Sequence, residues 1–237
     1  MEFNMNESNA WGKSAVVYST GTAAAPDSAS MPAHRVLRNT YALLALTLTF
    51  SAAVAAVSAA LRLPHPGILL TLVGYFGLLF ATYKLSNSVW GLGAVFALTG
   101  FMGYTLGPIV SHYLANAGGD EIVAMAFGGT ALIFFGLSAW VLTSKRDFSF
   151  MGGFLFAGMI VALLAGLAAV FFQMPALSLA VSAAVVLLMS GMILFETSRI
   201  VNGGETNYIL ATVSLFVSIF NLFTSLLQLL GFMNSDD

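Results

Sequence analysis

Seven long apolar stretches, separated by short polar connections, constrain this chain more than any other feature of its sequence. They lie at about residues 41–61, 68–83, 90–113, 122–143, 150–172, 177–200 and 208–232. A helix needs about 20 apolar residues to cross the hydrocarbon core of a bilayer, and most of these stretches reach that length. Only 8% of the residues are charged, whereas soluble domains contain roughly 25%. The sequence therefore predicts an all-α integral membrane protein with seven transmembrane helices.

The polar residues around these stretches predict three regions and an orientation. Residues 1–33 are rich in Asn, Ser, Ala and Gly and lack helical periodicity, which predicts a disordered cytosolic tail. Residues 34–233 are expected to form the transmembrane domain, and residues 234–237 an outward-facing C-terminus. With the tail in the cytosol, seven of the eight Lys and Arg residues lie inside and only Arg62 lies outside. This bias follows the positive-inside rule, so in a bacterium the N-terminus is cytoplasmic and the C-terminus periplasmic.

Glycine recurs at helix-packing intervals in the second and third stretches. The residues concerned are Gly74, Gly77, Gly100, Gly103 and Gly107. Small residues three or four positions apart let two helix backbones approach closely. We therefore expect a tight bundle with these glycines at helix interfaces, and we expect Pro108 to kink or end the third helix.

Polar residues in the last stretch fall on one face of its helix. They are spaced by four, three, four and three positions, at Ser214, Ser218, Asn221, Ser225 and Gln228. Such a stripe normally faces protein or trapped water, because unsatisfied polar groups are costly in hydrocarbon. The spacing predicts that the seventh helix is central. The alternative role for the stripe is hydrogen bonding between helices, at about 0.6 kcal/mol per bond.

Glu196 is the one acidic residue inside a predicted span, and Arg199 follows it by one turn. An ionisable side chain within a span is a candidate functional group. Folding the chain back at residues 202–206 puts Glu196 at the depth of Ser214, with Ser218 one turn deeper. With Asn221, these residues form a predicted polar core that binds a cation or relays a proton. The alternative is that Glu196 and Arg199 form only an interfacial ion pair.

Motifs for catalysis or cofactor binding are absent from the sequence. No GxGxxG lies between a strand and a helix, and the P-loop, HExxH and GxSxG patterns do not occur. The chain has no cysteine, its three histidines are scattered, and no basic cluster with interleaved aromatic residues suggests nucleic-acid binding. We expect no catalytic residues, no metal and no cofactor, and hence a protein that is not an enzyme.

Four segments make the chain resemble a known family. They are HRVLRNTYALL at residues 34–44, LTGFMGYTLGPI at 98–109, GGTALIFF at 128–135 and FETSRIVNGGETNYILATVSLFVSIFNLF at 195–223. On these segments the chain resembles the Bax inhibitor-1/YccA family of seven-helix membrane proteins, and its bacterial YccA branch in particular. The resemblance implies six helices around a central seventh. It also implies an inner-membrane modulator that binds the ATP-dependent protease FtsH and its HflK/HflC partners and competes with other membrane substrates.

Other branches of that family look like pH-sensitive calcium leak channels with one acidic residue on each of the sixth and seventh helices. Glu196 matches the first of these positions, and Ser218 stands at the second. The missing carboxylate removes a charged oxygen ligand for a divalent cation. The leading hypothesis is therefore a protease modulator whose cytosolic tail gives the protease a grip. The alternative is a pH-sensitive cation or proton leak channel lined by Glu196 and the stripe.

Overall fold

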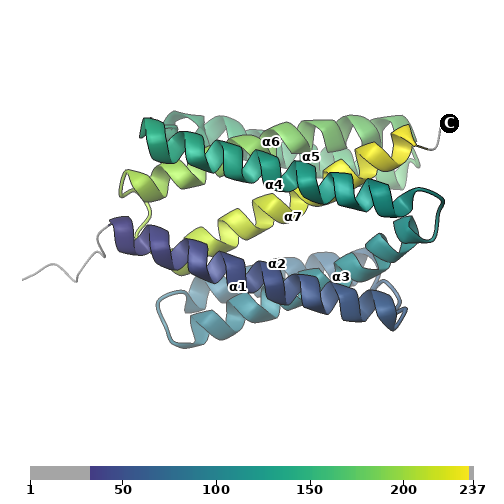
Figure 1. Ribbon diagram of the computed structural model, residues 1–237, viewed down its shortest axis with the longest axis horizontal. Helices are drawn as coiled ribbons and strands as arrows, with labels where there is room; N and C mark the ends of the chain where they lie inside the picture. Colours follow the sequence, from purple (N-terminus) through teal and green to yellow (C-terminus); the bar gives the residue numbers. More distant parts are fainter. Residues whose placement is uncertain (1–32, 235–237) are drawn as a thin grey trace, which may run out of the picture. The chain divides into compact units, whose positions relative to one another are not determined.

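The computed structural model describes residues 33–234, and every regular element in this range is helical. Figure 1 shows the elements, which are α1 (Ala33–Ala60), α2 (Ile68–Leu85), α3 (Trp90–Leu114), α4 (Gly119–Ser144), η1 (Ser149–Met151), α5 (Gly152–Phe171), α6 (Pro175–Val201) and α7 (Tyr208–Met233). Seven of these helices are long and apolar enough to cross a membrane. The prediction of an all-α protein with seven spans is confirmed. The predicted tail, apart from Ala33, and residues 235–237 lie outside the described residues.

The helix ends agree with the predicted spans to within three residues, except at the start of α1. This helix begins at Ala33 and not at residue 41. The span was predicted from apolar residues alone, which excluded Arg35 and Arg38, but a helix continues through the membrane interface where cationic side chains reach water. Helix α3 runs through Pro108 to Leu114, so it does not end at the proline. Neighbouring helices make such a proline tolerable within a membrane.

Helix α7 is the central helix, as the polar stripe predicted. In its most apolar window 56% of the residues are buried, against 6% in α2 and 11% in the span containing α5. It packs against α1, α3, α4 and α6, and Figure 1 shows it crossing between α1 and α4. Helix α2 packs mainly on α3, and α5 mainly on α6. The six helices around α7 therefore comprise four that contact it closely and two that lie farther out.

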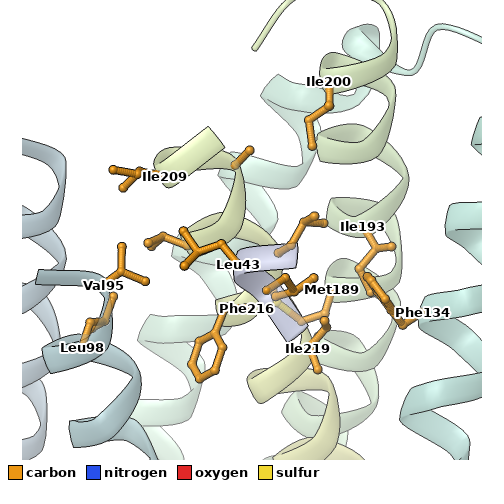
Figure 2. Packing of buried hydrophobic residues seen from close by; sticks show 14 of the residues in the cluster. Leu43, Val95, Leu98, Phe134, Met189, Ile193, Ile200, Ile209, Phe216 and Ile219 are labelled. Carbon is orange, nitrogen blue, oxygen red and sulfur yellow. The ribbon is translucent and has the colours of Figure 1, made fainter. Parts of the chain in front are cut away.

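The core around α7 combines large apolar side chains from five helices. Phe216 of α7 is 1% exposed and belongs to one cluster with Leu43 of α1, Leu98 of α3, Phe134 of α4 and Ile193 of α6. Figure 2 shows these side chains converging from their helices. Lipid tails are as apolar as leucine, so burial from water drives little of this association. The cluster is held mainly by close van der Waals contact.

Helices α1 and α3 form the most extensive helix pair. Gly103 of α3 lies directly against the backbone carbonyl of Ser51, and Gly107 lies against Ser58. A methyl group at either glycine would overlap with α1, so glycine sets how closely the two helices approach. The predicted interface role holds for these two glycines and also for Gly74 and Gly100, which lie against aromatic side chains of the neighbouring helix. Gly77 of α2, in contrast, faces open space.

Hydrogen bonds between helices show which helix ends meet. The Thr212 hydroxyl near the start of α7 donates to the Thr40 carbonyl near the start of α1, at 3.3 Å. The Ser198 hydroxyl near the end of α6 donates to the Arg146 carbonyl after α4, at 3.2 Å. We call this side of the bundle the basic end because it carries Arg35, Arg38, Lys84, Lys145, Arg146 and Arg199. The other side, with Arg62, Asp120 and Glu121, is called the opposite end.

Candidate functional site

A tight loop at residues 202–207 joins α6 to α7 and sets the geometry of the predicted polar core. Gly203 has a φ of 76°, in the left-handed region that glycine adopts without a steric penalty. The backbone N–H groups of Gly204 and Glu205 donate to the Arg199 carbonyl at 2.7 and 3.1 Å. A glycine just beyond the last helical turn is a common way to end a helix. The sequence Asn-Gly-Gly therefore reverses the chain within a few residues.

Asn207 fixes the start of α7. Its Oδ1 accepts hydrogen bonds from the backbone N–H groups of Ile209 and Leu210, at 2.9 and 3.3 Å. These donors have no partner within the helix, so the cap stabilises its first turn. The Nδ2 group donates to the Ser86 carbonyl at 3.2 Å and to Asn87 Oδ1 at 3.0 Å. One side chain thus caps α7 and ties it to the loop between α2 and α3.

Glu196 is buried near the basic end of α6, with its side chain 5% exposed. Arg199 Nη1 lies 3.6 Å from Glu196 Oε2, and Arg199 Nη2 lies 3.2 Å from Glu205 Oε2. The guanidinium also lies over the Phe195 ring, 5.5 Å from its centroid. One arginine is therefore shared by a buried carboxylate and a loop carboxylate. The geometry of the predicted interfacial ion pair is present, and Glu205, which sequence reasoning missed, extends it.

The structure brings only part of the predicted polar core together. Ser214 lies beside the Glu196 carboxyl group, as the reversal at residues 202–206 predicted. One turn deeper, the Ser218 hydroxyl is buried and donates to the Ser214 carbonyl at 2.9 Å. Asn221 Nδ2 donates to the Val217 carbonyl at 2.8 Å. Ser218 and Asn221 thus use these donors within their own helix and not on Glu196.

The far end of the stripe joins α7 to α6. Gln228 Nε2 donates to Ser178 Oγ, and Ser182 Oγ donates to Gln228 Oε1, both at 2.6 Å. Gln228 and Ser178 line a crevice of about 620 Å³ at the opposite end, beside His112. At Gln228 the stripe therefore serves hydrogen bonding between helices. The spacing of the stripe predicts the correct face for Gln228, whereas its two partners on α6 leave no signal in the sequence of α7.

The site as a whole presents one buried carboxylate that an adjacent guanidinium neutralises. An ion pair of this kind ties the last turn of α6 to the loop that follows, because Arg199 also contacts the Gly204 carbonyl at 3.4 Å. Binding a cation at Glu196 requires that Arg199 move away or that the cation compete with it. A role for Glu196, Arg199, Ser214, Ser218 and Asn221 in ion or proton movement stays a prediction.

Replacing Arg199 with glutamine is expected to destabilise the protein more than replacing Glu196 with glutamine. Breaking a fully buried pair costs about 3–5 kcal/mol. Arg199 is 32% exposed, so we expect the free energy of unfolding to fall by about 2 kcal/mol when its loss leaves the Glu196 carboxylate unpaired. Glu196→Gln leaves Arg199 paired with Glu205 and is expected to cost about 1 kcal/mol or less. Unfolding of the purified variants in one detergent measures both changes, and a larger loss for Glu196→Gln contradicts the ion-pair role.

Comparison with known proteins matches nearly the whole described chain. The family model described as Inhibitor of apoptosis-promoting Bax1 matches residues 33–235. The Escherichia coli K12 protein named Modulator of FtsH protease YccA is 58% identical over 203 residues, which cover 86% of this chain and 92% of that protein. A relative from Escherichia coli O6:H1, named Inner membrane protein YccA, has the same identity and coverage. An uncharacterised protein of Pseudomonas aeruginosa is 58% identical over 202 residues, covering 85% and 91% of the two chains.

Proposed function

Because the chain belongs to the family described as Inhibitor of apoptosis-promoting Bax1, and is 58% identical to a protein named as a modulator of FtsH protease, we propose that it modulates an FtsH protease. The observation that carries this proposal is the identity over 203 residues, which cover 86% of the chain. The relatives' names describe a modulator, an inhibitor and an inner membrane protein, and none of these is the name of an enzyme. We therefore assign the chain a binding role in the bacterial inner membrane.

The proposed mechanism is competition for the protease. An ATP-driven protease that extracts a membrane protein must separate its helices before it can degrade them. Helix α1, the first that such an enzyme meets from the N-terminus, packs on α3 through the Gly103 and Gly107 contacts and also on α7. A bundle that resists this separation occupies the protease for longer than a loosely packed substrate does. Other membrane substrates are then degraded more slowly.

We assign the contact with the protease to residues 1–33, which precede α1 in the sequence, and the described part of α1 starts at the basic end. Lys and Arg residues favour the cytoplasmic side of a membrane, so the basic end faces the cytoplasm and the C-terminus faces the periplasm. FtsH with its HflK/HflC partners then meets the chain at its cytoplasmic N-terminus. The exposed apolar side chains of the outer helices, such as Phe80 and Phe154, face the lipid bilayer.

An affinity pull-down from native membranes in mild detergent tests this proposal. The intact protein is compared with a variant lacking residues 2–30 and with one in which these residues are replaced by a Gly/Ser sequence of equal length. We expect FtsH to co-purify with the intact protein and with neither variant, which assigns the contact to the native N-terminal sequence. Recovery of FtsH with the truncated form moves the contact to the bundle. Absence of FtsH from all three samples overturns the proposal.

A cation or proton leak is the second candidate function, and the observation that favours it is the placement of Ser214 beside the buried Glu196. We rank this candidate below the modulator function because Arg199 already pairs with Glu196, and a cation would have to compete with it. If the protein is a leak pathway, ion flux into liposomes is expected to exceed that of empty liposomes and to fall for Glu196→Gln. Flux equal to that of empty liposomes removes this candidate.

A further inference from the structure

An apolar groove of about 800 Å³ lies between α1 and α4, in the half of the bundle near the opposite end. Helices α1 and α4 each pack on α7, which crosses between them in Figure 1. Phe216 and Phe220 of α7 line the groove between the two helices. Phe127 and Phe135 of α4, which also line the groove, are 69% and 65% exposed, so the groove is open at the outer surface of the bundle, where lipid surrounds a membrane protein, and α7 forms its floor.

The wall of the groove offers almost only hydrocarbon. Three of its residues carry a hydroxyl group, and all the others are apolar. The Thr49 hydroxyl donates to the Ala45 carbonyl at 2.8 Å, and the Thr130 hydroxyl donates to the Ala126 carbonyl at 2.7 Å, each within its own helix. An occupant thus gains little from hydrogen bonding here. It gains van der Waals contact with alanines of α1 on one side and phenylalanines of α4 on the other.

One cationic residue, Arg62, comes in the sequence just after the α1 residues that line the groove. The backbone N–H of Arg62 donates to the carbonyl of Ala59, a wall residue, so Arg62 lies within one turn of the groove. Its side chain is exposed, and neither ion pair in the described range involves it. Arg62 comes after the last turn of α1, where the hydrocarbon region gives way to headgroups. An exposed guanidinium at this depth is suited to pair with a phosphate.

We propose that the groove binds one phospholipid of the outer leaflet, with an acyl chain between α1 and α4 and its phosphate at Arg62. The volume lies within the range of about 300–1,000 Å³ that is usual for small-molecule sites. The bilayer supplies acyl chains at the mouth of the groove, and the cation complements the headgroup of the same molecule. A transmembrane helix of a partner also fits an apolar wall, but it leaves the charge of Arg62 without a role. The lipid site is independent of protease binding and requires only that the basic end be cytoplasmic.

Filling the groove tests the acyl-chain part of this proposal. Ala56 and Ala53 are both exposed alanines of α1, but only Ala56 lines the groove. The protein and its Ala56→Phe and Ala53→Phe variants are placed in nanodiscs of phosphatidylethanolamine and phosphatidylglycerol, released, and weighed by native mass spectrometry. We expect the parent protein and Ala53→Phe to retain a phospholipid. We expect Ala56→Phe to retain it about tenfold less, which corresponds to about 1.4 kcal/mol.

The contact between the lipid phosphate and Arg62 is tested with separate variants. These variants also test the proposal if Ala56→Phe fails to fold. Arg62→Gln is expected to lower lipid retention several-fold, whereas Lys84→Gln at the basic end is expected to leave it unchanged. The proposal is overturned if the parent protein retains no lipid, or if Arg62→Gln and Ala56→Phe both retain it fully. A photo-reactive residue at position 56 that links to another protein in native membranes, and not to lipid, also overturns it and assigns the groove to a partner helix.

Discussion

Replacing Gly103 with alanine is expected to lower the free energy of unfolding by about 3 kcal/mol or more. The added methyl group meets the backbone carbonyl of Ser51 on α1, and a backbone atom cannot rotate away as a side chain can. Overpacking in a well-packed core usually costs about 1–3 kcal/mol, and contact with backbone puts this site at the upper limit. Relief requires that α1 move away from α3, across the most extensive helix pair of the bundle.

The control for this prediction lies in the same helix. Gly93 of α3 has open space where its Cβ would be, so Gly93→Ala adds no clash. Alanine is favoured over glycine within a helix by up to about 1 kcal/mol, and we expect Gly93→Ala to be neutral or slightly stabilising. Thermal unfolding of both variants in the same detergent gives the comparison. Equal stability of the two variants contradicts the assignment of Gly103 as the contact point between α1 and α3.

Removing residues 2–30 is expected to abolish the protein's competition with other FtsH substrates. If the protease engages the chain through this segment, the truncated bundle no longer occupies it. Degradation of a second membrane substrate then returns to its rate without the protein, and the truncated protein itself is no longer degraded. A loss of competition by at least about tenfold corresponds to about 1.4 kcal/mol of binding free energy. Pulse-chase measurement of both proteins in cells gives the two rates.

The Gly103→Ala variant provides the matched control for this experiment, because it keeps the N-terminal segment and loosens the bundle. It is expected to engage the protease but to be degraded faster than the intact protein, and so to compete for a shorter time. The truncated form is expected not to bind the protease, whereas Gly103→Ala is expected to bind it but to be unfolded by it more easily. Competition that persists after truncation would falsify the assignment of the contact to residues 1–33, and unchanged turnover of Gly103→Ala removes the role of packing.

The seven spans were predictable because a single property, apolar length, decides them. Each stretch that is long enough to cross the hydrocarbon core appears as a helix, with only the start of α1 displaced. The central place of α7 also followed from the sequence, because residues at intervals of three and four share a helix face. The family resemblance is confirmed by the match over residues 33–235. The sequence did not predict which helices contact α7, because the predicted spans are apolar around most of their surface.

The sequence predicted where the residues of the candidate site lie, but it did not predict their hydrogen-bond partners. The reversal after Arg199 was enough to bring Glu196 and Ser214 to one depth. The sequence did not reveal that Ser218 and Asn221 donate to carbonyl groups of their own helix. A hydroxyl or amide side chain in a helix can donate either to the carbonyl one turn earlier or to a group on a neighbouring helix. Asn207 carried a readable signal, a capping residue directly before an apolar run. Its hydrogen bonds to Ser86 and Asn87 depend on the tertiary fold, so no pattern in the neighbouring sequence predicts them.

The packing of α1 has a mechanical consequence for any motor that pulls from the N-terminus. Force that enters at α1 is borne first by the helices on which α1 packs, mainly α3, with which it forms the most extensive interface in the bundle, and α7. The motor therefore meets this resistance at the first step of extraction, before any helix has left the bundle. A motor that slips at this point releases an intact protein that needs no refolding. Resistance to degradation then depends on the shear strength of the interfaces that α1 makes, more than on the packing of helices that α1 does not contact.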